Sequence, residues 1–220
     1  MSKVRIDNAI SIDGFTAGPD QSMDHPLGVR GHDIMQWQIQ SGVMQAASTA
    51  TEIPPGTEGS ELVVYEHFQN IGAYIMGRNM FGGGPGDWPT DPAWDGWWGT
   101  NPPYHTPVFV LTNHPREALT LEGGNVFHFV TEGPEAALEL ARQAAGDRDI
   151  RIAGGASTVS QYLQLGVVDE LQLHIAPVLL GSGERPFDGV DPTSLGFTID
   201  RVIRGSQATH IRYAVTRSGG

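Results

Sequence analysis

The chain has 220 residues, of which 39% are hydrophobic and 17% charged, the composition of a folded globular protein rather than a disordered one. Its formal net charge of −12 disfavours nucleic acid or an anionic membrane surface as a partner, because both attract clustered lysine and arginine. There is no cysteine, which excludes disulfides, thiolate nucleophiles and cysteine-ligated zinc. The chain begins without a signal-peptide pattern and has no apolar run long enough to span a membrane, so we expect a cytoplasmic protein.

Strand and helix patterns alternate through most of the sequence. In chain order they predict a strand over 4–12, helices over 33–47 and 60–71, strands over 73–76, 107–111 and 125–130, a helix over 134–145, a strand over 150–153, a helix over 156–165, and strands over 170–180, 197–203 and 207–216. This alternation favours a doubly wound, mostly parallel sheet, to which the strand-rich C-terminal part should add antiparallel strands. No repeat or linker divides the sequence, so we predict one α/β domain over residues 1–220.

Several of these helices have recognisable end signals. Ser60 fits an N-cap, Pro134 a first helical turn, and Gly166 a C-cap. Pro54 and Pro55 interrupt the chain between the first two helices, because a helix cannot continue through consecutive prolines.

Residues 82–104 combine three consecutive glycines, five prolines and four tryptophans. The glycines do not match a dinucleotide fingerprint, because Pro85 breaks the strand–turn–helix context that such a motif needs. The aromatic side chains, Trp88 among them, could stack on a planar heterocycle or form a lid. Packing of a long loop or a subunit contact would explain them equally well.

The strongest local signal for a ligand follows the predicted strand over 150–153. Five residues lead from that strand into a helix: Gly154, Gly155, Ala156, Ser157 and Thr158. Unpaired N–H groups at a helix start suit a pyrophosphate, and glycines allow it to approach the backbone. An ordinary tight turn capped by a hydroxyl explains the same residues about as well.

Two further strand ends carry groups suited to a phosphate or an adenosine. They are Gly77-Arg78-Asn79 and Leu111-Thr112-Asn113-His114, the latter followed by Arg116. Taken alone, Arg78 is more simply explained as an exposed arginine. Because the carboxyl ends of parallel strands meet at one edge of a sheet, the three strand ends together predict a ligand crevice there.

Two carboxylates are candidates for orienting or protonating a substrate. Asp13 follows the first strand and Asp33 begins the first predicted helix. As alternatives, Asp13 suits a turn and Asp33 an N-cap. The spacing of the eight histidines matches no metal motif, so we expect surface or sheet-face histidines and no metal site.

Several stretches of the sequence resemble known enzymes. Residues 9–15 and 76–81 resemble the dihydrofolate reductase superfamily. Residues 152–156, 166–171 and 177–183 are more specific, and resemble the reductase domain of the bifunctional riboflavin-biosynthesis deaminase–reductase in a stand-alone form. The similarity covers nearly the whole chain.

The resemblance implies a dihydrofolate-reductase-like sheet that binds NADPH at its carboxyl edge. It assigns the cofactor contacts as follows: Ala9 and Ile10 beside the nicotinamide, Gly77, Arg78 and Asn79 at the phosphates, Leu111, Thr112, Asn113 and His114 near the adenosine 2′-phosphate, and Gly154, Gly155, Ala156, Ser157 and Thr158 at the pyrophosphate. Arg78, Thr112, His114 and Arg116 together would favour NADPH over NADH.

The resemblance also bears on the substrate side and on assembly. Asp33 and Trp37 loosely match the family's Asp-x-x-x-Trp setting, which makes Asp33 a catalytic candidate and Trp37, with Trp88, a substrate-contact candidate. Met80 stands where the family usually has threonine, and the deaminase half is absent. Family members commonly dimerise through the C-terminal β region, so residues 170–180 are a candidate interface of a homodimer.

Three hypotheses follow. The first is an NADPH-dependent reductase that transfers a hydride to a small planar heterocycle, pterin- or pyrimidine-like, or to a related C=N or C=O group, with Asp13 or Asp33 polarising the substrate. The second is a dinucleotide-binding module without turnover, and the third a dimerisation scaffold that binds no dinucleotide.

Overall fold

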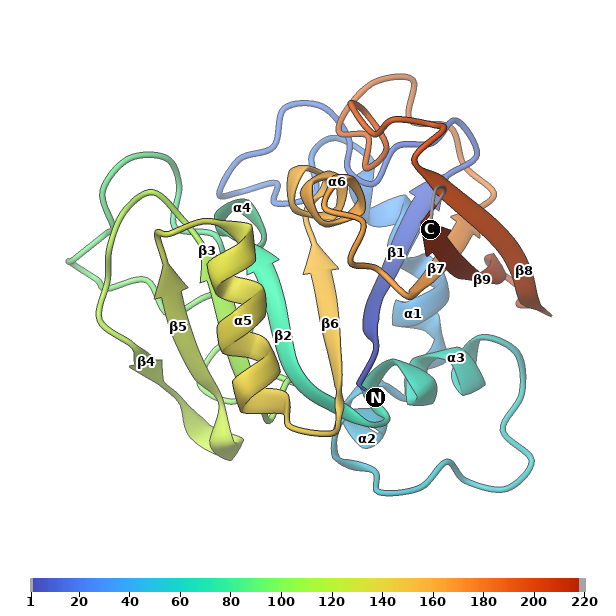
Figure 1. Cartoon of the computed structure of the whole chain (residues 1–220), viewed down its shortest axis with the longest axis horizontal. Helices are drawn as coiled ribbons and strands as arrows, with labels where there is room; N and C mark the ends of the chain where they lie inside the picture. The colour runs from blue at the N-terminus through green and yellow to red at the C-terminus, as the bar shows by residue number, and fades with distance from the viewer. Residues whose placement is uncertain (1, 218–220) are drawn as a thin grey trace.

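Nine strands within residues 2–217, the part of the chain that the computed structural model describes, join in one sheet (Figure 1). Their spatial order is β4-β5-β3-β2-β6-β1-β7-β9-β8. The six neighbours from β5 to β7 are parallel, whereas β4 at one edge and β9 and β8 at the other pair antiparallel. The strands are β1 (Val4–Ser11), β2 (Ile71–Gly77), β3 (Pro107–Leu111), β4 (Leu119–Thr120), β5 (Val126–Val130), β6 (Asp149–Gly154), β7 (Glu170–Ala176), β8 (Leu195–Arg204) and β9 (Thr209–Arg217).

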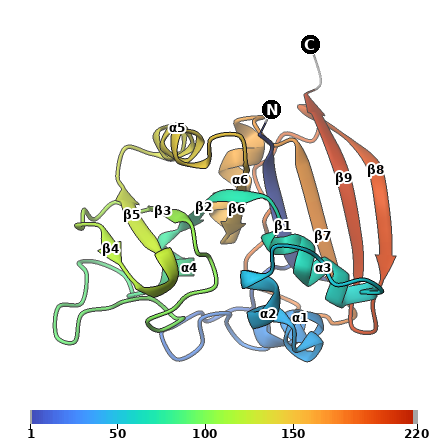
Figure 2. The same cartoon turned by 90° about the horizontal axis from the view of Figure 1, so that it is seen from below.

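Helices cover both faces of the sheet, as Figure 2 shows. On one face lie α5 (Pro134–Ala145) and α6 (Ala156–Gln164), and on the other α1 (Gln36–Ser41), α2 (Met44–Thr49) and α3 (Gly59–Phe68). The short elements are the 3-10 turns η1 (Gly31–Met35) and η2 (Glu122–Gly124), and α4 (Arg78–Phe81), which directly follows β2.

The alternation of side chains along the strands separates the two cores. On β2, Ala73 and Ile75 pack with α5 and α6, whereas Tyr74 and Met76 pack on the opposite face. On β1, Ile6 belongs to the first core, and the next residue, Asp7, is buried on the face that α1 and α3 cover. A buried charge at that position means that the second face is not purely apolar.

The predicted fold class is confirmed: the sheet is mostly parallel, with helices on both faces and antiparallel strands at the C-terminal end. The predicted helix over 33–47 is wrong. It is divided into η1, α1 and α2, because Gly42 adopts a left-handed conformation (φ +68°) and its N–H bonds to the carbonyl of Ile39, closing α1.

Other boundaries also differ from the sequence patterns. The strand predicted over 170–180 ends at Ala176, since Pro177 has no N–H to continue the ladder. Ile71 begins β2 instead of ending a helix, and neither β4 nor α4 was predicted. Among the described residues, no helix combines the length and the apolar character needed to cross a bilayer.

Candidate active site

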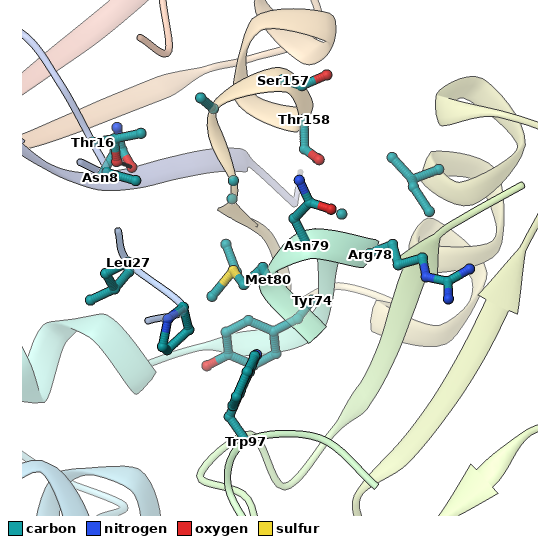
Figure 3. A pocket seen from close by; sticks show the side chains of 18 of the residues that line it. Asn8, Thr16, Leu27, Tyr74, Arg78, Asn79, Met80, Trp97, Ser157 and Thr158 are labelled. Carbon is teal, nitrogen blue, oxygen red and sulfur yellow. Dashed lines mark hydrogen bonds between the residues drawn. The ribbon is translucent and has the colours of Figure 1, made fainter. Parts of the chain in front are cut away.

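A cavity of about 1150 Å³ opens at the carboxyl edge of the parallel strands. The ends of β1, β2, β3, β5 and β6 line it, together with residues of α1, α3 and the loop over 82–104. Figure 3 shows Asn79, Ser157 and Thr158 grouped on one side of this space and Tyr74 and Trp97 on another. The volume slightly exceeds that of most small-molecule sites, so it has room for a dinucleotide and a small substrate together.

The turn from β6 into α6 forms an open cradle in this cavity. The chain passes through Gly154 (φ +125°) and a cis peptide bond to Gly155, the N-cap of α6. No side chain caps the helix, so the first-turn N–H groups of α6 lack side-chain acceptors. A Cβ atom placed on Gly155 would meet nothing within 4 Å. The space above this helix start is therefore accessible to an anion.

The end of β2 lies beside this cradle. A Cβ atom on Gly77 would come within 2.4 Å of the Thr158 hydroxyl oxygen, so only glycine allows β2 and α6 to approach this closely. Arg78 follows, with its guanidinium carbon 3.9 Å from the centroid of the Trp88 ring. Its Nε and Nη1 atoms are buried without a hydrogen-bond partner, and burial lowers the pKa of Arg78. A bound anion would satisfy these donors.

The end of β3 contributes the third wall. Leu111, Thr112, Asn113 and His114 all line the cavity. The Thr112 hydroxyl accepts a hydrogen bond from the His114 backbone N–H at 3.1 Å, and His114 Nδ1 is 3.1 Å from a carboxylate oxygen of Asp87. The structure thus brings together all of the predicted cofactor-binding residues except Ile10, which is buried in the core between β1 and the helices α5 and α6.

Arg116 has a different environment from Arg78. Its guanidinium donates to the carbonyl of Trp94 at 2.6 Å and pairs with Asp95 at 3.6 Å. It does not line the cavity. Arg116 holds the loop over 82–104 and is not part of a 2′-phosphate pocket in this conformation.

That loop packs its aromatic side chains against β2, β3 and β5. Trp88 contacts Phe81 and Phe129 edge-to-face, and its indole N–H donates to the carbonyl of His114 at 2.8 Å. Trp97 and Trp98 line the cavity, whereas Trp88 does not. Of the two predicted substrate contacts, Trp37 lies at the cavity wall and Trp88 lies behind Arg78.

Neither predicted catalytic carboxylate lines the cavity. Asp13 accepts hydrogen bonds from the Ser11 hydroxyl at 2.5 Å and from the Gly181 N–H at 2.7 Å, and these bonds lower its pKa to about 2. Asp33 is exposed and pairs with Arg30 at 3.0 Å. As placed here, Asp13 fixes the loop after β7 and Asp33 stabilises η1.

The structure instead places a different carboxylate, Asp7, at the cavity floor. It is buried together with His67, Arg151 and His174, and all four line the cavity. His174 Nε2 hydrogen-bonds to Asp7 Oδ1, His67 Nδ1 is 3.2 Å from Asp7 Oδ2, and an Arg151 nitrogen is 3.9 Å from the same oxygen. A fifth residue, His210, lies 2.8 Å from the other ring nitrogen of His174.

The expectation of surface or sheet-face histidines holds for His174 on β7 and His210 on β9 but not for His67, which is buried on helix α3. A signal for the cluster was present in the sequence. Asp7 and Arg151 interrupt apolar strands at alternate positions, the pattern of polar residues that share one face of a sheet. The spacing cannot show that α1 and α3 cover that face.

The electrostatics of the cluster follow from burial and from its neighbours. Burial by itself would raise the pKa of Asp7, but His67, Arg151 and His174 surround it and hold that pKa well below its ordinary value. Burial, together with Arg151, holds the pKa of His67 well below its ordinary value. Burial likewise lowers the pKa of His210 to about 3. Asp7 is thus a carboxylate balanced by Arg151, in a cluster where burial favours the neutral form of His67 and of His210.

Asp7, His67 and His174 could in principle hold a metal ion, since one ligand atom of each lies within 4.8 Å of the others. The Arg151 guanidinium contacts both Asp7 and the second ring nitrogen of His67. A divalent cation in the same space would be repelled by this guanidinium. The donor set therefore does not favour a metal.

Comparison with known proteins identifies the family of this chain. The model of the RibD C-terminal domain family matches residues 2–211. A 40-residue segment is 48% identical to YyaP of Bacillus subtilis, an uncharacterised protein, and spans 21% of that protein.

Solved structures agree with this match. A riboflavin-biosynthesis candidate protein from Shewanella sp. PV-4 is 20% identical, with a TM-score of 0.58 over 98% of this chain and 99% of the other. RibD of Acinetobacter baumannii is 19% identical, with a TM-score of 0.54 over 98% of this chain and 58% of that protein. The chain therefore spans less than two thirds of the full RibD protein. At these identities the structures show a shared fold.

Proposed function

The chain belongs to the RibD C-terminal domain family, and on this basis we propose that it is an NADPH-dependent reductase of a small pyrimidine-like compound. The observation that best supports this proposal is the group of unpaired N–H donors on one wall of the cavity. There the uncapped start of α6 and the unpartnered donors of Arg78 lie at neighbouring strand ends, as a dinucleotide with a 2′-phosphate requires.

The cofactor fits the residues that are present. Gly154–Thr158 would hold its pyrophosphate, Arg78 with Thr112 its 2′-phosphate, and Ala9 would lie beside the nicotinamide. When bound, the reduced nicotinamide supplies the hydride, while the cavity orients the substrate and excludes water.

The remaining part of the cavity suits a flat polar substrate. The side-chain N–H groups of Asn8 and Trp37 line the cavity and are buried without a partner. Such donors match the ring carbonyls of a pyrimidine or pterin, and leaving them unsatisfied is unfavourable. Neither residue's side-chain donor was identified from the sequence.

A direct experiment combines binding with turnover. Purified protein is titrated with NADPH and with NADH while tryptophan fluorescence is followed, and NADPH oxidation is then monitored with pyrimidine ribosides and pterins. Micromolar binding that favours NADPH, followed by substrate-dependent oxidation, supports the proposal. Binding without oxidation would favour a dinucleotide-binding module instead, and absence of saturable binding would refute both.

Arg78→Ala should weaken NADPH binding about 10- to 100-fold and NADH binding much less. The reason is that one charge-assisted contact to a phosphate is worth about 1.5–3 kcal/mol and NADH lacks the 2′-phosphate. Fluorescence titration measures both constants. Arg142→Ala, which removes an exposed arginine from α5, serves as the control. Equal losses for the two dinucleotides in the Arg78 variant would show that the 2′-phosphate binds elsewhere.

We further propose a homodimer through the C-terminal strands, with the contact on β8. The side chains of β7 are almost all buried within this chain, so we place the contact on the edge strand beyond β9. Phe197, Ile199 and Val202 are exposed on β8, and the bulge between Ile199 and Arg201 keeps all three on one face.

Ile199→Asp should therefore convert the dimer into a monomer, because a charge would be buried in the contact. Light scattering after size exclusion measures the mass of each form. Thr198→Asp, on the opposite face of the same strand, should leave the dimer intact. A natural chain that is monomeric at high concentration would contradict the proposal.

A further inference from the structure

A chain of hydrogen-bonded side chains runs from the cavity floor toward the protein surface. His174 Nε2 contacts Asp7, His174 Nδ1 is 2.8 Å from His210 Nδ1, and His210 Nε2 is 3.0 Å from the Ser60 hydroxyl. Asp7 and His174 line the cavity, whereas His210 does not. Ser60 is partly exposed in the first turn of α3. The four groups thus link the site to solvent by a path separate from its mouth.

The position of each proton in this chain follows from its neighbours. An ionised Asp7 can only accept, so His174 must carry its proton on Nε2. The two Nδ1 atoms of His174 and His210 face each other at 2.8 Å, so one donates and the other accepts, and a relay toward Asp7 requires His210 to be the donor. His210 Nε2 is left to accept from the Ser60 hydroxyl. Every donor therefore points toward Asp7.

His67 lies near the other carboxylate oxygen of Asp7. Its Nε2 contacts the Arg151 guanidinium, which can only donate, so the proton of His67 lies on Nδ1, facing Asp7. Arg151 keeps its charge under all ordinary conditions and cannot pass on a proton. The carboxylate consequently has one route to solvent protons among these neighbours, through His174.

We propose that Ser60, His210 and His174 form a relay that delivers the proton consumed in the reduction through the Asp7 carboxylate. The proposal rests on the reductase function. The hydride adds to the substrate carbon, and the π electrons of the C=N or C=O bond take a proton that the Asp7 carboxylate receives from His174 Nε2 and passes on, so Asp7 is ionised before and after the step. His174 Nδ1 takes the proton of His210, His210 Nε2 takes that of Ser60, and Ser60 is reprotonated by water. Each imidazole is then protonated on its other ring nitrogen, so the return of both rings to their starting tautomers completes the cycle.

The surroundings hold the two imidazoles in line. The Trp37 ring centroid lies 4.3 Å from that of His174 and 4.9 Å from that of His210, so one aromatic ring packs against both imidazoles. The other ionisable groups packed against Asp7 are His67 on α3, Tyr74 on β2 and Arg151 on β6. Burial raises the pKa of Tyr74, which therefore does not exchange protons near neutral pH.

The protonation pattern can be tested without any substrate. We expect ¹⁵N spectra of the histidine rings at neutral pH to show the proton on Nε2 of His174 and on Nδ1 of His210. A proton on Nδ1 of His174 would break the relay and overturn the proposal. This result is independent of whether the protein has reductase activity.

A second test distinguishes a role of His210 in proton transfer from a purely structural role. In His210→Asn, the amide N–H takes the place of ring Nδ1–H and still donates to His174, but an amide cannot relay a proton. We expect kcat to fall about 10- to 100-fold with KM unchanged, and the solvent deuterium isotope effect on kcat to rise. His128→Asn, which removes a histidine outside the cluster, should match the natural enzyme in both measurements.

The outcomes distinguish the relay from the function on which it rests. An active His210→Asn variant with the natural kcat refutes the relay and leaves the reductase intact. A natural protein that oxidises no NADPH with any substrate refutes the proposed function, and the ring spectra then decide whether the proton chain exists. A fall in kcat accompanied by an equal rise in KM would show a structural role for His210 and would also overturn the relay.

Discussion

The Gly155→Asp variant should be more stable than the natural chain and should bind NADPH at least about 100-fold more weakly. Gly155 is the N-cap of α6, with extended backbone (φ −74°, ψ −158°) and open space where a Cβ would lie. An aspartate there can accept from the free N–H groups of the first turn and interacts favourably with the helix dipole, which together stabilise by about 0.5–1 kcal/mol.

The same carboxylate would occupy the position that we assign to the pyrophosphate. It removes the N–H donors and adds like-charge repulsion, and a 100-fold loss corresponds to about 2.7 kcal/mol. Thermal unfolding measures the first effect and fluorescence titration the second. Gly155→Asn is the matched control, because it caps the helix without charge and should lose less affinity. If Gly155→Asp binds NADPH as well as the natural chain, the pyrophosphate lies elsewhere.

Asp7→Asn should lower the free energy of unfolding by about 3–5 kcal/mol at pH 7. The substitution hardly changes the volume of the side chain, but it leaves Arg151 as a buried cation without its carboxylate. It also replaces an acceptor-only group by an amide whose N–H faces the donor atoms of His67 and His174. Denaturant unfolding measures this loss. It is a large fraction of the 5–15 kcal/mol that is typical of a domain.

The sign of the pH dependence follows from the lowered pKa of Asp7. Because that pKa is lower in the folded than in the unfolded chain, the ionised carboxylate stabilises the protein above the unfolded value of about 3.9. This contribution is lost as the pH falls from there through the folded pKa. The difference in the free energy of unfolding between the natural chain and the Asp7→Asn variant should therefore be constant near neutral pH and shrink below about pH 4.

An exposed carboxylate provides the control for Asp7. Asp33→Asn removes one partner of the exposed pair with Arg30, and such pairs contribute about 0–1 kcal/mol. If Asp7→Asn is no more destabilising than Asp33→Asn, then Asp7 is not the ionised centre of the cluster. Its assignment as the carboxylate of the site would then fail.

Much of the proposed cofactor-binding wall of the cavity could be predicted from the sequence, because the residues that form each part of it are close together in the chain. Gly77 and Arg78, or Gly155 and Ser157, are neighbours in the chain, and a strand that ends at a glycine before a helix has the same geometry in many sheets. Parallel pairing then brings these strand ends to one edge. The fold class followed in the same way from alternating strand and helix patterns.

The carboxylate that lines the cavity could not be predicted in this way. Asp13 and Asp33 were chosen because they stand at element ends, yet each is held by local partners outside the cavity. Asp7 lies in the middle of strand β1. From the sequence, a charged residue in a strand is expected to face solvent, unless a helix covers that face of the sheet. The helix expected over 33–47 is divided at Gly42 into α1 and α2, and both of these pack against α3.

The order of the elements, the glycine turns and the arginine beside them could be inferred from the sequence, since these depend on residues close together in the chain. Which carboxylate lines the cavity depends instead on how distant segments of the chain pack together. Asp7, His67, Arg151 and His174 come from four elements, and the four residues are between 23 and 167 positions apart along the chain. Sheet register and the covering helices bring them together, and it is their shared burial that makes their charges and protons depend on one another.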